Sequence, residues 1–133
     1  MFQNKNIKRL KNEITEKIPL KQKKYAKFSY YKEFENGKIT FSFYKKVIGL
    51  TLYFNDELPY DTHDNIFKIG IENQSQIHPK CKCGALGYDF IEFDFFKDVL
   101  NDLTCNDLIT ASENLIKFYN NNITKYLVKP DYK

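Results

Sequence analysis

The residues of this chain best suited to metal binding or nucleophilic chemistry are three cysteines and two histidines. His78, Cys81 and Cys83 lie close together, and imidazole and thiolate are ligands that zinc prefers. Cys105 or His63 could supply a fourth ligand. However, cysteines separated by one residue depart from the usual two-residue spacing of a zinc knuckle, and no second paired knuckle follows. We therefore favour a polar loop with two incidental thiols over a zinc site, and we predict no metal and no other cofactor.

The same loop could in principle carry a reactive thiol, because Lys80 and Lys82 flank the cysteines and would lower their pKa. A catalytic cysteine usually lies beside a structured element such as a helix N-terminus, and nothing in the sequence places one there. His63 lies between acids and could act as a base, but the residues after Pro59 have the composition of a turn. Phosphate-binding glycine loops and the glycine-flanked serine of hydrolases do not occur. We therefore predict that the protein is not an enzyme.

Acidic side chains gather between residues 86 and 107, a segment with six acids and one lysine. Asp94, Asp98 and Asp102 recur every four residues, which predicts one stripe along an amphipathic helix of residues 94–103. Like charges at this spacing repel by roughly 0.2–0.5 kcal/mol per pair, so the stripe suggests a surface kept for a cationic partner. The alternative is an ordinary solvated helix face. The predicted partner-binding residues are Asp89, Glu92, Asp94, Asp98 and Asp102.

Charge is unevenly distributed along the chain. Residues 1–48 contain 13 basic and 4 acidic side chains, whereas residues 49–133 contain 8 basic and 13 acidic ones. Lysines and aromatic residues interleave in the basic part, a pattern that can hold single-stranded nucleic acid by charge and stacking. They are Lys21, Lys23, Lys24, Lys27, Tyr25, Phe28, Tyr30 and Tyr31. The chain has a single arginine, which limits bidentate recognition of bases and phosphates. Nucleic-acid binding is therefore possible, but less favoured than protein binding.

These candidate residues must be positioned by a small number of elements. Ile7, Leu10 and Ile14 predict a first helix over residues 5–17, which Pro19 ends. Alternating apolar residues predict strands, and Asn36-Gly37 predicts a hairpin turn between the first two. The predicted strands cover residues 25–34, 38–44, 49–54 and 65–72, followed by a loop at 73–87. Residues 88–93 are either a fifth short strand or an approach to the next helix.

The last helix is predicted from Thr104 and Asp107, which fit a capping box that opens it. Leu108, Leu115 and Phe118 would form part of its buried side, and three consecutive asparagines from Asn120 would end it. The chain is thus expected to form a single α+β domain over residues 1–133. Its expected architecture is an N-terminal helix, an antiparallel four- to five-stranded meander sheet, and two C-terminal helices packed on one face.

Composition limits the class of protein further. The longest nearly apolar run has about eight residues, far fewer than the ~20 needed to span a bilayer. An odd number of cysteines, with no secretory signal pattern at the N-terminus, indicates a reducing compartment. We therefore expect a soluble, cytoplasmic protein that does not act at a membrane.

The function predicted from these features is that of a protein-binding inhibitor module of the bacterial immunity or antitoxin type. In this hypothesis the acidic helix and the 73–87 loop cover a basic surface of a toxin domain and neutralise it by steric occlusion. The net charge of +4 counts against a nuclease target in particular. The alternative is a nucleic-acid-binding or zinc-stabilised regulatory protein that uses the lysine-rich N-terminal third.

Overall fold

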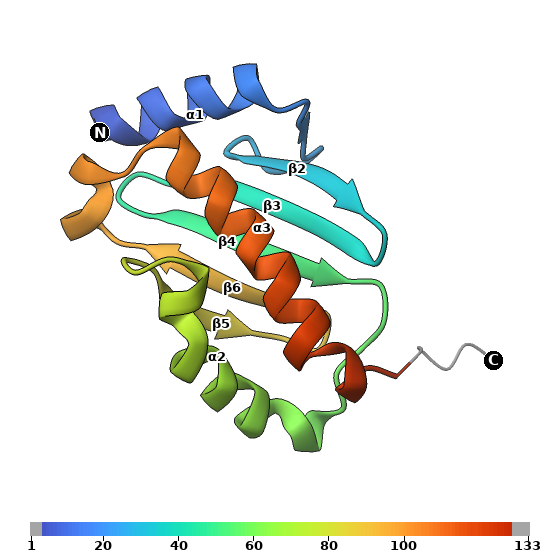
Figure 1. The fold of residues 1–133 in the computed structure, drawn as a ribbon. Coiled ribbons are helices and arrows are strands. Elements are labelled where there is room, and N and C mark those ends of the chain that lie inside the picture. Colours follow the sequence, from blue (N-terminus) through green and yellow to red (C-terminus); the bar gives the residue numbers. More distant parts are fainter. Residues whose placement is uncertain (1–3, 129–133) are drawn as a thin grey trace.

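Within residues 4–128, which the computed structural model describes, six antiparallel strands form one sheet, and three α-helices cover one of its faces (Figure 1). The α-helices are α1 (Lys5–Lys17), α2 (His63–Ile77) and α3 (Cys105–Asn122). The 3-10 helices are η1 (Tyr60–Thr62), η2 (Lys97–Asp102) and η3 (Thr124–Tyr126). The strands are β1 (Lys21–Gln22), β2 (Ser29–Phe34), β3 (Gly37–Phe43), β4 (Ile48–Phe54), β5 (Lys82–Leu86) and β6 (Phe90–Phe95), in the spatial order β1-β2-β3-β4-β6-β5. The predicted α+β class is confirmed.

Alternating side chains give the sheet two different faces, because successive residues of a strand point to opposite sides. The face under the helices is apolar and fully buried, and its central residues are Ile39, Phe41, Phe43, Leu50, Leu52, Ile91, Phe93 and Phe95. The residues between them in sequence, such as Thr40, Thr51 and Glu92, point to the other face. We call this second face the open face, because none of the described helices lies over it (Figure 1).

Three local predictions are confirmed: the first helix, the hairpin between β2 and β3, and the capping box that opens α3. Helix α1 buries Ile7, Leu10 and Ile14, and it ends just before Pro19. The predicted hairpin joins β2 to β3, although its two turn residues are Glu35 and Asn36, and Gly37 is the first residue of β3, paired with Phe34.

Helix α3 begins with the predicted capping box and lies over the middle of the sheet (Figure 1). The Thr104 hydroxyl accepts a hydrogen bond from the Asp107 backbone N–H at 3.1 Å, and the Asp107 carboxylate accepts one from the Thr104 N–H at 2.8 Å. Two orphan donors of the first turn are thereby satisfied.

The predicted strand over residues 65–72 is wrong, because this segment belongs to helix α2. The alternation of Phe67, Ile69 and Ile71 suggested a strand, yet Ile71 is 47% exposed. The buried side of the helix is instead formed by Ile66, Gly70 and Ile77, at helical spacing. A Cβ atom at Gly70 would lie only 2.8 Å from the Cys83 sulfur, so the glycine lets α2 approach β5 closely.

The predicted loop over residues 73–87 is also wrong. It contains the last turns of α2, a short turn, and the edge strand β5. Strand β5 pairs with β6 through a register shift at Gly84, the one residue between the paired Cys83 and Ala85. No helix in residues 4–128 is long and apolar enough to cross a membrane.

Candidate functional site

The acidic stripe predicted along one helix does not form. Asp94 belongs to strand β6, while Asp98 and Asp102 belong to the 3-10 helix η2. Strand β6 forms because its odd-numbered residues, such as Phe93, pair against β4 and enter the core. In η2 there are about three residues per turn, so positions four apart do not align.

The structure nevertheless brings two of the five predicted acids together. Glu92 and Asp94 are two residues apart on β6, so both side chains point to the open face. Asp98 lines an adjoining depression together with Phe96, which also lies beside Glu92 and Asp94. Asp89 lies at the other end of β6, and Asp102 is exposed at the end of η2.

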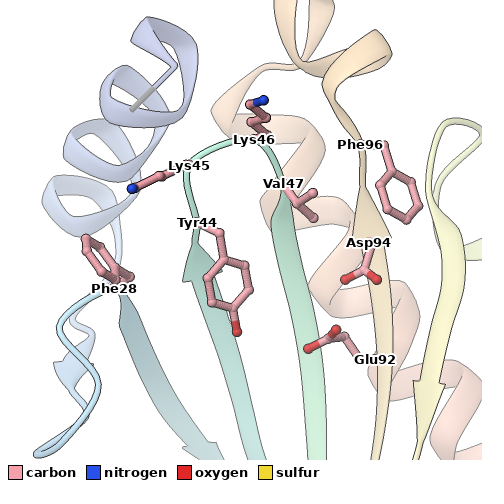
Figure 2. Close-up of a pocket in the computed structure, with 8 residues that line it drawn as sticks. All are labelled: Phe28, Tyr44, Lys45, Lys46, Val47, Glu92, Asp94 and Phe96. Atoms are coloured by element: carbon pink, nitrogen blue, oxygen red, sulfur yellow. The ribbon is translucent and has the colours of Figure 1, made fainter. Parts of the chain in front are cut away.

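Glu92 and Asp94 line a groove of about 750 Å³ at the end of the open face where the β3–β4 hairpin turns (Figure 2). Its walls come from three separate parts of the chain: the residue before β2, the hairpin, and the end of β6. The lining residues are Phe28, Tyr44, Lys45, Lys46, Val47, Glu92, Asp94 and Phe96. We call this cavity the acidic groove.

Small residues lie beside the acidic groove. Ser29, Ser42, Gly49 and Asp94 are paired across β2, β3, β4 and β6 in one row. The two serine hydroxyls hydrogen bond to each other at 2.8 Å. Gly49 contributes no side chain, and a Cβ atom there would lie 3.3 Å from a Glu92 carboxyl oxygen and 3.4 Å from an Asp94 oxygen. The two carboxyl groups therefore lie directly against Gly49, where a larger residue would crowd them.

The other walls are aromatic. Phe28 is 52% exposed, Tyr44 46% and Phe96 42%. Large apolar side chains left in water at one place on the surface are typical of a binding site. The acidic groove thus combines apolar walls with two acidic groups.

The carboxyl groups are held in different ways. Glu92 accepts a hydrogen bond from the Thr51 hydroxyl at 2.7 Å. One oxygen of Asp94, Oδ1, is buried and has no hydrogen-bond partner within residues 4–128. In the same part of the chain, neither carboxyl group forms an ion pair with a basic side chain. The two acids are therefore not neutralised by the described part of the molecule.

The pKa of Asp94 is raised to about 7, first by burial and then by the neighbouring Glu92 carboxyl group, through a side-chain hydrogen bond and its negative charge. A proton or another cation near the two carboxyl groups would relieve their repulsion. Perturbed carboxyl pairs in a groove are typical of functional sites.

The thiols do not form a reactive site. Burial raises the pKa of Cys81 to about 11 and that of Cys83 to about 12, which outweighs the flanking lysines. The Cys81 thiol donates to the Gln74 carbonyl oxygen at 3.3 Å. Both cysteines are therefore neutral thiols near pH 7, the form that is a poor nucleophile.

The histidines are engaged elsewhere. His78 Nδ1 accepts a hydrogen bond from the Lys80 backbone N–H at 3.1 Å, and its Nε2 lies 3.4 Å from an Asp107 oxygen. His63 begins α2, and its ring lies against Tyr60. No cluster of three or more His, Cys, Asp and Glu side chains suited to a metal ion occurs in the described residues.

The lysine and aromatic residues of the basic segment are divided between the two faces of the sheet. Tyr30 lies on the core side, with its ring 6.2 Å from that of Phe43. On the open face, the Lys38 ammonium lies 4.9 Å from the Tyr31 ring and the Lys23 ammonium lies 4.4 Å from the Tyr53 ring. The interleaved pattern in the sequence therefore does not produce one aromatic surface.

Sequence reasoning found Glu92 and Asp94 but missed that they line a groove with Tyr44, Val47 and Phe96. The available signal was the strict alternation of residues 90–95, which places both acids on one face of a strand. Comparisons with protein-family models, curated proteins and solved structures found no significant match.

Proposed function

We propose that this chain is a protein-binding inhibitor module of the immunity or antitoxin type, which neutralises a toxin domain by covering a basic surface. The observation that carries the proposal is the acidic groove, where Glu92 and Asp94 have no cationic partner among residues 4–128 and lie beside exposed aromatic side chains. Such a site suits contact with a positively charged surface.

Aromatic side chains support this proposal, since they supply most of the binding energy at many protein interfaces. Phe28, Tyr44 and Phe96 are partly exposed around the acidic groove and can be covered by a partner without rearranging the core. Asp98 adds a third carboxyl group next to Phe96, in a depression that Lys46 and Lys97 also line. The groove would then be the centre of a contact that covers roughly 800 Å² on each partner.

The lysines near the groove set the direction of approach. Lys45 and Lys46 are exposed at the tip of the β3–β4 hairpin. Figure 2 shows the Lys45 side chain directed away from the two carboxyl groups. A basic partner would therefore approach over β6, where Glu92, Asp94 and Asp98 lie, and avoid the hairpin tip.

The test is protection of cells from a toxin encoded next to this gene, together with isolation of the binary complex. Wild-type protein should restore growth, and the double variant Glu92→Gln, Asp94→Asn should protect less well. The matched control is Glu72→Gln, Glu113→Gln, which removes two exposed carboxylates from α2 and α3. Absence of both protection and complex with the wild-type chain would contradict the proposal.

Nucleic-acid binding is the second hypothesis, and the geometry supports it less. Tyr30 is on the core side, and the rings of Tyr31 and Tyr53 already contact lysine ammonium groups. A labelled oligonucleotide whose fluorescence anisotropy rises at low salt and falls steeply with added salt would favour it.

A further inference from the structure

We infer that the acidic groove is the receptor for one arginine side chain of the partner protein, with the guanidinium between the Glu92 and Asp94 carboxyl groups and the aromatic walls. This inference rests on the proposed function and adds the chemistry of the contact.

The two carboxyl groups favour a cationic ligand. Thr51 binds one oxygen of Glu92, and Asp94 Oδ1 has no partner. Above the pKa of Asp94 both groups are charged, and a bound cation would relieve their repulsion. Only two acidic groups meet here, and no metal-binding cluster occurs in the described residues, so an organic cation fits better than a metal ion.

The aromatic walls of the acidic groove favour arginine over lysine. A guanidinium is planar, weakly hydrated and able to donate several hydrogen bonds to carboxylates, and it stacks on aromatic rings. The acidic groove offers both features, because Tyr44 and Phe96 stand beside Glu92 and Asp94 (Figure 2). A lysine ammonium is compact and strongly hydrated, so it gains less from apolar walls.

The described chain does not fill the groove itself. Its single arginine, Arg9, is held on α1, where it contacts Glu13 at 3.0 Å and the Leu103 carbonyl oxygen at 3.1 Å. Lys45 and Lys46 line the groove near the hairpin tip but form no ion pair with its acids within residues 4–128. Within residues 4–128, therefore, no basic side chain pairs with these acids, which leaves the groove available to a cation of the partner.

The experiment is an NMR titration of the isotope-labelled chain at about pH 8, above the pKa of Asp94, with three tripeptides. The tripeptides are acetyl-Gly-Arg-Gly-amide and its lysine and citrulline counterparts. We expect saturable shifts at Gly49, Asp94 and Phe96 with the arginine peptide, weaker ones with lysine and none with citrulline. Equal shifts from arginine and citrulline, or shifts confined to other surfaces, would overturn the inference.

Two kinds of variant test the same site by different routes. Asp94→Asn removes charge and should weaken arginine-peptide binding about tenfold. Gly49→Val keeps both acids but adds a side chain whose Cβ atom alone would lie 3.3 Å from a Glu92 oxygen, so it should displace the carboxyl groups and also weaken binding. The spectrum of each variant reports directly whether it has folded. Glu113→Gln, on the exposed side of α3, should bind like wild type, and unchanged affinity in all the variants would refute the assignment.

The peptide titration and the cell-protection test can fail separately. If arginine peptides bind in the acidic groove but no toxin is neutralised, the proposed function is wrong and the ligand chemistry of the groove stands. If the toxin is neutralised equally well by Asp94→Asn and Gly49→Val, the proposed function stands and the arginine receptor is wrong.

Discussion

The Asp94 carboxylate on β6 occupies the place where a side chain at Gly84 on β5 would begin. A Cβ atom at Gly84 would overlap Asp94 Oδ2, and the register shift between β5 and β6 lies at this same glycine. The position of one acid of the acidic groove is therefore fixed by the absence of a side chain on the neighbouring strand.

The first prediction follows from this contact. Gly84→Ala should displace the Asp94 carboxylate and destabilise the fold by about 1–3 kcal/mol, because well-packed sites accept added atoms only with strain. Urea unfolding measures the change. The same substitution made in an Asp94→Ala background should cost clearly less, since the overlapping group is gone. Equal costs in the two backgrounds would show that the contact is unimportant.

The second prediction concerns pH. Burial and the Glu92 carboxyl group raise the pKa of Asp94 from 3.8 to about 7 in the folded state. Between these values the folded chain retains a proton that the unfolded chain has lost, so the contribution of Asp94 to stability falls as pH rises from about 4 to about 7 and then levels off.

Asp94→Asn should abolish this contribution and make the protein more stable at about pH 8. The gain should be about 1–2 kcal/mol, which allows for solvent screening of a partly buried carboxyl group. Thermal melts of both proteins across this pH range measure it. If Asp94→Asn shows the same pH dependence as wild type, another group is responsible.

The third prediction concerns the aromatic walls. Phe96→Ala should weaken partner binding by about 2 kcal/mol or more, as expected for an anchor near the centre of an interface. Its stability should change little, because Phe96 is 42% exposed. Isothermal titration calorimetry with the purified partner measures the affinity. Tyr60→Ala is the control, since Tyr60 is 88% exposed but lies before α2, outside the groove.

The fourth prediction concerns the thiols. Cys81 and Cys83 should react slowly with an aromatic disulfide reagent near pH 7, because both are largely buried and burial raises their pKa to about 11 and about 12. Denaturant should make both react quickly. Serine variants of either cysteine should still bind the partner. Rapid modification of the folded protein would revive the hypothesis of a thiol enzyme.

Local signals in the sequence were sufficient where neighbouring residues alone determine the structure. The spacing of Ile7, Leu10 and Ile14, the hairpin signal of Asn36-Gly37 and the Thr104–Asp107 capping box each indicate their element without help from distant residues, although the hairpin turn itself is one residue earlier, at Glu35 and Asn36. The class of the fold follows from these elements together with the alternation in β3 and β4.

The predictions that failed are those in which tertiary packing selects between two periodicities. Residues 65–72 alternate like a strand, yet α2 buries Ile66 and Gly70 because the glycine lets the helix approach Cys83. Asp94, Asp98 and Asp102 have helical spacing, yet pairing with β4 keeps Asp94 in a strand. The two acids of the acidic groove were predicted, but its other walls could not be, because they meet only through the register of four strands.

The acidic groove forms only when three distant parts of the chain fold together. Phe28, the β3–β4 hairpin and the end of β6 are far apart in sequence, so no shorter piece of this polypeptide carries the complete surface. A partner that contacts all three parts would bind only the folded chain and would therefore stabilise it against unfolding. Tight association would then protect the chain from proteases, and excess unbound copies would be degraded first.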